Sequence, residues 1–236
     1  MIEQFGRWAA EQTGLDRRTQ AALGDVRRQV AAYRRSAPAF VRLGENIDAS
    51  IEALIERLEV AAPLMAEHSR AVSSWCSRVG RVLGLSEDEI TFVSRCGLIH
   101  DIGKMRTPLE ILDAPRQLSR DEWAIMRDHA AEGARIVGRV PVLVPLVPIV
   151  RGHHERLDGS GYPDGLRLST IPLASRIVSV ADSFNAMIGR RPYRLPLSPT
   201  QALDELDRNR ETQFDPEVVE AMVRVVLGRL AQAPKM

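Results

Sequence analysis

The sequence predicts an all-α protein, and three observations support this fold class. Residues 3–35 are rich in Ala, Arg, Glu and Gln and contain few β-branched residues, a composition that favours helix. Further along the chain, apolar residues recur at helical spacing, as at Ile51, Leu54 and Leu58. Ser-x-x-Glu sequences, which form capping boxes at helix starts, precede two later apolar runs.

The bounds of the first three helices are predicted from proline and glycine residues that end or start a helix, as well as from the spacing of apolar residues. The helix over residues 3–35 ends before Pro38, because the residue before a proline is driven out of the helical region. A second helix is predicted over about 47–60. Pro63 opens a third, which Gly84 ends.

The two capping boxes define the next helices. The box at residues 86–89 starts a helix that reaches His100. The box at residues 119–122 starts a helix that is expected to carry both His129 and Ile136.

The last third of the chain alternates loop and helix. Residues 142–151 lead to a pair of histidines, and residues 155–168 contain enough Gly and Pro to predict a rigid, turn-rich loop. A helix is predicted over about 172–188. Asp215 and Pro216 make a good N-cap and first-turn pair for the last helix.

Two tryptophans and one apolar run are candidate packing residues. Trp75 and Trp123 fall within predicted helices, and large aromatic side chains dominate core packing, so we expect both to pack against neighbouring helices. The apolar residues 140–150 are expected to be buried as well.

Length and composition exclude several classes of protein. The chain has 236 residues, 44% of them hydrophobic, which suits one large domain or one domain with an extension. A net charge of +1 does not indicate a nucleic-acid-binding protein. The two cysteines form no C-x-x-C pair, the first ten residues contain no apolar core, and the longest apolar run is too short to span a bilayer. We therefore expect a cytoplasmic protein without a membrane or nucleic-acid partner.

All five histidines lie in the middle of the chain, in patterns that suit metal binding. They are His68, His100, His129, His153 and His154, accompanied by the carboxylates Asp101 and Asp182. Neutral imidazole and carboxylate are ligands that divalent transition metals accept. A single histidine is more often a packed or capping residue, so the prediction depends on the joint arrangement over five helices.

The adjacent pair His100 and Asp101 suggests more than one metal. Neighbouring residues on a helix point about 100° apart, so the pair does not easily serve one metal from one direction. It can serve two metals if Asp101 bridges them, as a two-metal hydrolytic centre requires.

The residues around these ligands resemble a known family. Residues 98–104, Leu-Ile-His-Asp-Ile-Gly-Lys, resemble the signature of HD phosphohydrolases, and residues 153–165, from His-His-Glu to Tyr-Pro-Asp-Gly, resemble the HD-GYP signature. The similarity continues through residues 176–182, 191–194 and 212–216, and covers roughly residues 64–226. It implies an HD-domain helical bundle with the C-terminal helices of HD-GYP proteins.

The resemblance also implies a domain organisation. Residues 61–232 correspond to the HD-GYP catalytic domain. Residues 1–60 lie outside the resemblance and are expected to form an additional N-terminal helical segment, with a cap, a regulatory segment or a dimerisation segment as alternatives. A homodimer through these helices is one expected assembly.

The implied activity is a metal-dependent phosphodiesterase that hydrolyses cyclic di-GMP to pGpG, with further hydrolysis to GMP left open. One metal would be held by His68, His100, Asp101 and Asp182, and the second by His129, His153, His154 and the bridging Asp101. Fe or Mn is expected, with Zn and Ni as alternatives. Some family members have a glutamate four residues before the first histidine and bind a third metal; Leu64 occupies that position here, which predicts a dinuclear site.

The chemistry assigns catalytic roles to Asp101, which would bridge the two metals, and to Lys104. Two cations about 3.5–4 Å apart would lower the pKa of a bridging water, and the resulting hydroxide would attack the phosphodiester in line. Lys104, one helical turn after His100, is expected to stabilise the transition state or to protonate the leaving oxygen. The alternative is an exposed lysine at a helix end.

Six residues are candidates for substrate contacts: Lys104, Gly161, Tyr162, Pro163, Arg191 and Arg194. The glycine lets backbone approach a ligand, the tyrosine can meet a nucleotide, and arginine binds phosphate with paired donors. A plain turn and surface arginines are the simpler alternatives.

Two other functions stay open. One is hydrolysis of another nucleotide, because the HD scaffold supports several phosphoesters. The other is a catalytically weak module that binds a cyclic dinucleotide. Arg190, Leu195 and Glu211 depart from residues that are frequent in the family, and these departures could change which nucleotide fits.

Overall fold

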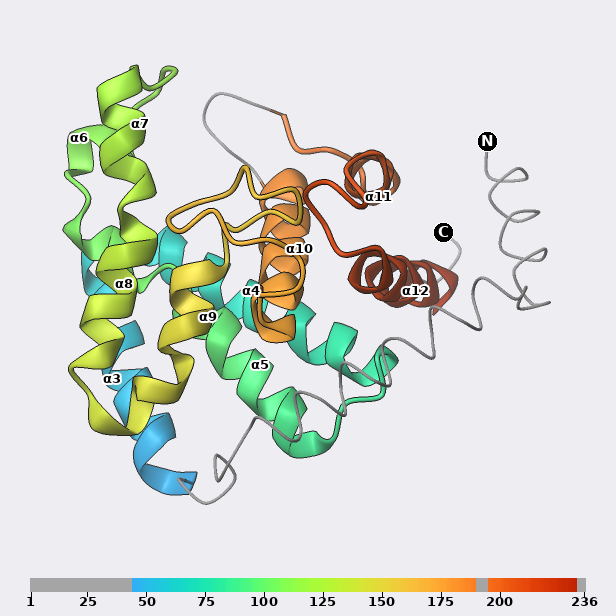
Figure 1. Cartoon of the computed structure of the whole chain (residues 1–236), viewed down its shortest axis with the longest axis horizontal. Helices are drawn as coiled ribbons and strands as arrows, with labels where there is room; N and C mark the ends of the chain where they lie inside the picture. The colour runs from blue at the N-terminus through green and yellow to red at the C-terminus, as the bar shows by residue number, and fades with distance from the viewer. Residues whose placement is uncertain (1–43, 190–194, 233–236) are drawn as a thin grey trace. The chain divides into compact units, whose positions relative to one another are not determined.

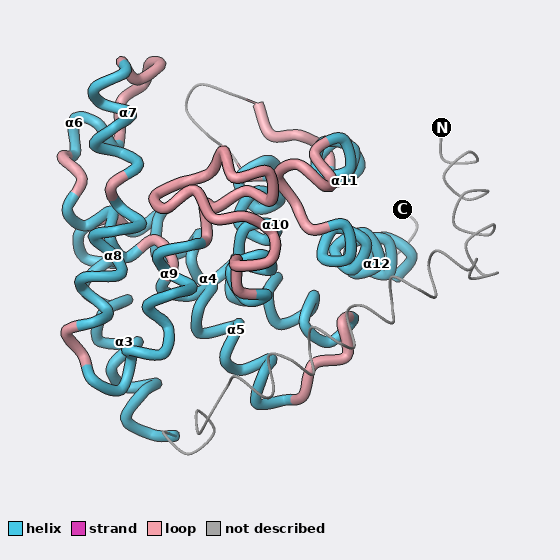
Figure 2. Tube along the Cα trace, in the orientation of Figure 1, coloured by secondary structure: helices cyan, strands magenta, loops and turns pink. Residues whose placement is uncertain are grey.

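The computed structural model describes residues 44–189 and 195–232, which belong to one compact unit. The described residues are helical, and their β contacts are two isolated bridges (Figures 1 and 2). The prediction of an all-α protein is therefore confirmed. The predicted helix over residues 3–35 lies outside the described residues, as do Arg190, Arg191 and Arg194.

The helices follow one another with short connections, except for the long loop before α10. They are α3 (Gly44–Ala61), α4 (Pro63–Val82), α5 (Glu87–Ile99), η2 (Ile102–Arg106), α6 (Leu109–Leu112), α7 (Arg120–Arg127), α8 (His129–Gly138), η3 (Pro141–Leu146), α9 (Val147–Gly152), α10 (Leu173–Ile188), α11 (Pro199–Arg208) and α12 (Pro216–Gln232). None of these helices is long and apolar enough to cross a membrane.

Helix α10 is the centre of the packing. It contacts α4, α5, α9, α11 and α12, among which it lies in Figure 1. Its residues 173–181 are all buried. Its Phe184 meets the ring of Trp75 edge-on, with centroids 5.0 Å apart. Burial of such an apolar helix supplies the main driving force for this arrangement. Asp182 therefore projects from a helix most of whose residues are buried.

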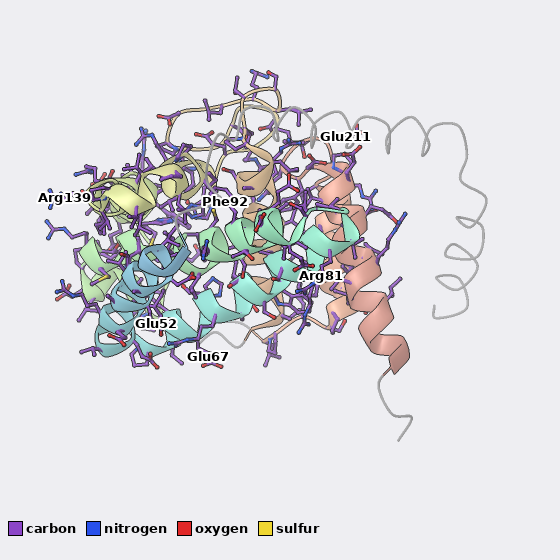
Figure 3. All side chains as sticks on the ribbon, turned by 90° about the horizontal axis from the view of Figure 1, so that it is seen from below. Glu52, Glu67, Arg81, Phe92, Arg139 and Glu211 are labelled. Carbon is purple, nitrogen blue, oxygen red and sulfur yellow. The ribbon has the colours of Figure 1, made fainter. Side chains whose placement is uncertain are left out.

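The outer sides of α3 and α4 carry the charges expected of amphipathic helices. Glu52, Glu67 and Arg81 are exposed there (Figure 3). The expected packing of Trp75 is confirmed, but that of Trp123 is wrong: its side chain is 51% exposed on α7. Helix α7 has no buried residue, so there is no core beneath it for a tryptophan to enter.

Both predicted capping boxes are present, but the second starts a shorter helix than expected. The side chains of Ser86 and Ser119 each accept a hydrogen bond from the backbone of the glutamate three residues later. The side chain of that glutamate accepts one from the serine backbone in return. Helix α7 then ends at Arg127, and α8 begins at His129. The predicted single helix over this stretch is thus two helices, and the break between them orients His129.

Helix α11 is an element that we did not predict from the sequence. Its start is a capping box of the Ser-x-x-Gln kind, with Pro199 in the first turn. The Gln201 backbone donates to Ser198 Oγ at 3.2 Å, and the Ser198 backbone donates to Gln201 Oε1 at 2.9 Å. The Ser-Pro-Thr-Gln sequence was the available signal.

Gly103 allows η2 to lie directly against α8. A Cβ atom at this position would be 1.9 Å from the carbonyl oxygen of His129 and 2.5 Å from the backbone nitrogen of Gly133. Only glycine permits this approach, which brings Asp101 beside His129.

Gly103→Ala is therefore expected to destabilise the protein by about 1–3 kcal/mol or more, because backbone on both sides must shift. Thermal unfolding of the metal-free protein measures this effect. Gly138→Ala is the matched control at the end of α8, since its Cβ would meet nothing closer than 3.6 Å. Equal stability of the two variants would contradict the close packing.

Glu211 adopts a backbone conformation that favours glycine, with φ of 65°. The family that the sequence resembles often has glycine here. Glu211→Gly is expected to stabilise the protein by about 0.5–1 kcal/mol, because relief of the left-handed strain exceeds the entropy that glycine adds to the unfolded chain. Glu211→Ala retains the Cβ atom and should not stabilise. Thermal unfolding of both variants checks this, and equal stabilisation would argue against backbone strain.

Candidate metal centre

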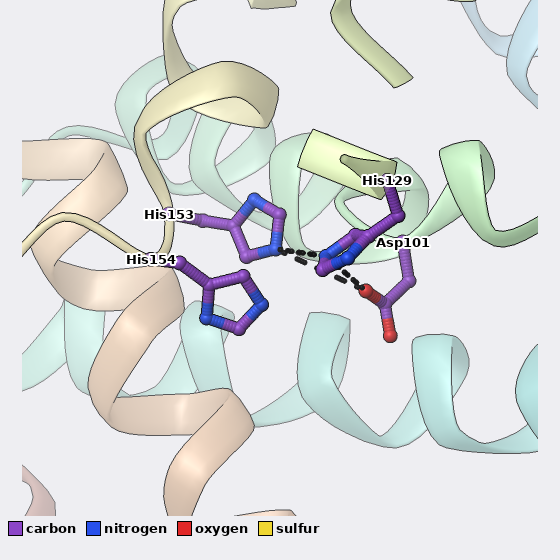
Figure 4. A group of neighbouring side chains, drawn as sticks. All are labelled: Asp101, His129, His153 and His154. Atoms are coloured by element: carbon purple, nitrogen blue, oxygen red, sulfur yellow. Dashed lines mark hydrogen bonds and ion pairs between the residues drawn. The ribbon is translucent and has the colours of Figure 1, made fainter. Parts of the chain in front are cut away.

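The structure brings all seven predicted ligands together from distant parts of the chain. They are His68 on α4, His100 after α5, Asp101 before η2, His129 at the start of α8, His153 and His154 after α9, and Asp182 on α10. Figure 4 shows Asp101, His129, His153 and His154 pointing toward one another. The ligand atoms of these four lie within 4.8 Å of one another, and so do those of His68, His100 and Asp101.

Asp101 lies between two sets of histidines. Its Oδ2 is 3.3 Å from His100 Nε2 and 3.9 Å from His68 Nε2. Its Oδ1 is 3.3 Å from His129 Nε2 and 3.9 Å from His153 Nε2. Each carboxylate oxygen therefore faces a different set, as a bridging ligand requires.

Asp182 and His154 complete the two sets. Asp182 Oδ1 is 2.9 Å from His68 Nε2 and 3.8 Å from His100 Nε2, so Asp182 belongs to the first set. The ring of His154 lies 4.1 Å from that of His153 and 5.0 Å from that of His129, between centroids, which places it in the second set.

Helix ends orient three of the histidines. The last carbonyls of a helix lack partners within the helix and accept hydrogen bonds from outside it. Nδ1 of each of these histidines donates to such a carbonyl three residues earlier: His100 to Gly97 at 2.9 Å, His129 to Met126 at 2.6 Å, and His153 to Val150 at 2.6 Å. With a proton on Nδ1, the Nε2 atom of each ring faces the centre, where its lone pair can bind a metal when the ring is neutral.

The buried polar atoms of the centre fit a cation. His129 Nε2 and His153 Nε2 are 3.3 Å apart, and since both rings donate through Nδ1, two lone pairs face each other there. In addition, His100 Nε2 and Asp101 Oδ1 are buried without a hydrogen-bond partner among the described residues. Unpartnered buried polar atoms are costly, and a divalent cation that displaces the Nε2 proton of His100 would satisfy all of these atoms.

Burial keeps the second set of histidines neutral. It lowers the pKa of His154 to about 3, that of His153 well below its usual range, and that of His129 as well. A metal binds neutral imidazole, so these rings need no proton loss to act as ligands near neutral pH.

The first set is electrostatically different. Burial opposes the charged form of His100, but Asp101 and Asp182 outweigh it and raise the pKa of His100 to about 10. Burial also opposes charge on Asp101, yet His100 and Lys104 hold the pKa of that carboxyl well below its usual range. Asp101 is therefore an ionised carboxylate, the form that binds metal.

Lys104 lies at the edge of the centre. Its Nζ donates to Asp101 Oδ2 at 2.6 Å, and its side chain is 22% exposed. The ammonium therefore contacts the Asp101 carboxylate, here called the central carboxylate, while part of the lysine side chain remains accessible to solvent and to a ligand.

The loop that carries Gly161, Tyr162 and Pro163 borders the second set. The Tyr162 ring stacks on His154, with centroids 4.8 Å apart and planes at 26°, and the Tyr162–Pro163 peptide is cis. A Cβ at Gly161 would lie 2.5 Å from Cα of Glu155, so only glycine lets the loop fold back here.

We did not assign roles to three residues near the centre from the sequence. The buried Glu155 carboxylate accepts backbone hydrogen bonds from Asp164 and Leu166 at 2.7 and 2.8 Å, which hold the loop closed. The Arg127 guanidinium lies 4.9 Å above the Tyr162 ring. Asn185 Nδ2 lies 2.8 Å from His68 Nδ1. Adjacency to His153 and His154 could have suggested Glu155, but no spacing rule indicated the other two.

Comparison with known proteins gives consistent results. The HD-domain family model matches residues 52–218. A cyclic di-GMP phosphodiesterase of Thermotoga maritima is 40% identical over 160 residues, which are 67% of this chain and 44% of the relative. A 3′3′-cGAMP-specific phosphodiesterase of Vibrio cholerae is 33% identical over 76% of this chain and 40% of its own length. The chain thus spans less than half the length of these two curated relatives.

Solved structures share the fold. A protein of Bdellovibrio bacteriovorus described as an HDG"Y"P protein superposes with a TM-score of 0.61 at 19% identity, over 92% of this chain and 74% of that protein. A cyclic GMP-AMP-specific phosphodiesterase of V. cholerae superposes with a TM-score of 0.52 at 29% identity, over 80% of this chain and 42% of that one. With its His/Asp cluster, its all-helical fold and the match over residues 52–218, this chain belongs to the HD-domain family and carries the signature of its HD-GYP members.

Proposed function

We propose that this chain is a metal-dependent phosphodiesterase that hydrolyses cyclic di-GMP to pGpG. The observation that carries the proposal is the position of Asp101, whose two oxygens face two separate sets of histidines. The phosphodiesterase relatives at 30–40% identity support the reaction class.

The centre is proposed to hold two divalent cations, Fe or Mn. His68, His100 and Asp182 serve one, His129, His153 and His154 serve the other, and Asp101 serves both. Leu64, one turn before His68, is an apolar side chain that is 80% exposed and offers no ligand for a third. When bound, two cations acidify a water and neutralise phosphoryl charge.

The chain's own residues bind and orient the substrate. Lys104 holds a proton at Nζ, beside the central carboxylate, where it can be donated to the leaving ribose oxygen. Tyr162 is proposed to line the nucleotide site, with Gly161 and Pro163 shaping the loop. Arg191 and Arg194 are proposed to bind the non-scissile phosphate.

A second candidate substrate is 3′3′-cGAMP. Relatives named for this substrate are 33% identical over more than three quarters of this chain, so sequence similarity does not separate the two nucleotides. A module that binds a cyclic dinucleotide without turnover is the third alternative. All seven predicted ligands and Lys104 are present, which favours turnover.

Metal analysis and activity on the same sample test the proposal. Protein prepared anaerobically and loaded with Fe or Mn is incubated with cyclic di-GMP, 3′3′-cGAMP, pGpG and simple nucleotides. We expect about two metals per chain and conversion of cyclic di-GMP to pGpG. A ratio near three contradicts the dinuclear site, faster conversion of 3′3′-cGAMP reassigns the substrate, and tight binding without product supports the third alternative.

Residues 61–232 are proposed to form the catalytic domain, and residues 1–60 a cap, regulatory or dimerisation segment. The last part of that segment, α3, packs against α4 and α5. Light scattering of the full chain tests the proposed homodimer, and a monomer at micromolar concentration contradicts it.

Arg127 is proposed as a further substrate contact at the mouth of the centre. Its guanidinium covers Tyr162 and has no ion pair within the part of the chain that the structure describes, so its donors are available to phosphate. Arg127→Ala is expected to raise KM about 10-fold or more with a smaller effect on kcat, as loss of a charged hydrogen bond does. Arg120→Ala, an exposed arginine at the start of α7, is the control. Equal KM for both variants would remove Arg127 from the site.

A further inference from the structure

His68 differs from the other oriented histidines of the centre. Nδ1 of His100, His129 and His153 meets a backbone carbonyl, which only accepts hydrogen bonds. Nδ1 of His68 instead meets the side-chain amide of Asn185, 2.8 Å away on α10. An amide presents either a donor or an acceptor, depending on its rotation about the last side-chain bond.

The amide orientation in this structure determines where the proton of His68 lies. Asn185 presents Nδ2, which only donates, so His68 Nδ1 must accept and the ring proton must be on Nε2. Nε2 then donates to Asp182 Oδ1 at 2.9 Å. In this arrangement His68 Nε2 has no lone pair to offer a cation, and Asp182 Oδ1 already accepts a hydrogen bond.

Rotation of the amide by half a turn reverses both assignments. Asn185 Oδ1 would then accept from Nδ1, and the same single proton would move from Nε2 to Nδ1 without a change in ring charge. His68 is about 20% exposed, so solvent can carry this proton. The move exposes the Nε2 lone pair and frees Asp182 Oδ1 together.

We propose that Asn185 is a positioning residue that switches His68 and Asp182 between a hydrogen-bonded pair and a pair of metal ligands. This rests on the proposed metal centre. The set of His129 and His153 has no such alternative, because its Nδ1 partners are carbonyls. The metal on the His68 side is therefore the one that exchanges, and the metal on the other side is retained.

Three variants of the full chain test the switch. Asn185→Asp presents only acceptor oxygens and keeps the proton on Nδ1. Asn185→Leu presents neither donor nor acceptor and leaves the ring unoriented. Ser183→Ala, also on α10 but without a bond to His68, controls for substitution in this helix.

The first measurement needs no metal and no activity. Nitrogen-15 NMR of the imidazoles in metal-free protein distinguishes the two ring tautomers of His68. We expect the proton on Nε2 in the wild type and in Ser183→Ala, and on Nδ1 in Asn185→Asp. A proton on Nδ1 in the wild type would overturn the proposal, whatever the metal content.

The second measurement follows zinc loss from loaded protein after a chelator is added. In the wild type we expect one equivalent of zinc to leave faster than the other. Loss of this faster equivalent should be about 10-fold faster in Asn185→Leu than in the wild type, and slower in Asn185→Asp. Identical loss from all variants overturns the switch. If the wild type binds no zinc, iron or manganese, the proposed metal centre fails. The NMR measurement needs no metal, so it still tests the contact between Asn185 and His68 in that case.

Discussion

Asp101→Ala is expected to lower kcat/KM by on the order of 10³-fold or more, beyond the 10–100-fold that is typical for residues that only support a ligand. It is also expected to reduce bound metal from about two per chain to one or none. The reason is geometric: Oδ1 is 3.3 Å from His129 Nε2 and Oδ2 is 3.3 Å from His100 Nε2. Removal of one side chain therefore takes a ligand from both metal positions.

The measurement combines metal analysis with steady-state kinetics on the same sample, after circular dichroism has shown that the variant is folded. Asp101→Asn keeps the shape but replaces one oxygen by a donor, so it should lose metal on one side first. Asp113→Ala, an exposed aspartate after α6, is the control and should retain metal and activity. Full activity in Asp101→Ala would refute the bridging role and with it the proposed function.

Lys104→Met is expected to lower kcat by about 10²–10³-fold while metal content is retained. The ammonium donates to Asp101 Oδ2 at 2.6 Å, and a protonated amine has no lone pair for a metal, so the substitution removes no metal ligand. Methionine keeps most of the side-chain length and removes the proton. Lys104→Arg should restore little, because a planar guanidinium does not replace a compact ammonium.

The choice of substrate separates two roles for this lysine. If Lys104 protonates the leaving oxygen, bis(p-nitrophenyl) phosphate, whose leaving group needs no proton, should be hydrolysed almost normally by Lys104→Met. If Lys104 stabilises phosphoryl charge, Lys104→Met should lower kcat by a similar factor for cyclic di-GMP and for bis(p-nitrophenyl) phosphate. Arg106→Met, an exposed cation on the same short helix, is the control. Loss of metal in Lys104→Met would show instead that the lysine acts only by holding Asp101.

Local features of this fold were predictable because their causes are local. The capping boxes at Ser86 and Ser119 depend on residues three apart, and the structure contains both. Asp215 caps α12 as expected, accepting a hydrogen bond from the backbone of Glu217 at 2.9 Å. The break between α7 and α8 was not predictable in this way, since it depends on packing against η2 and α9.

The composition of the candidate site was also readable from the sequence, and the resemblance implied two ligand sets that share Asp101, but the contacts around these ligands were not readable. Histidine and aspartate at these spacings indicated metal chemistry because few other uses concentrate these residues. Asn185 lies 117 positions from His68, and Arg127 lies 35 positions from Tyr162. Contacts over such separations depend on how the helices pack, and no local pattern reports them.

The sequence by itself determined the all-helical class, the capped starts of α5, α7 and α12 and the set of side chains able to bind a metal, because these follow from backbone preferences and side-chain chemistry. Only the tertiary structure decided the distances from the Asp101 oxygens to the two predicted histidine sets, and that Asn185, rather than a carbonyl, meets His68. The physical reason is that a hydrogen bond or a ligand bond forms only within about 3 Å. Burial of helices such as α10 is what brings distant residues within that distance.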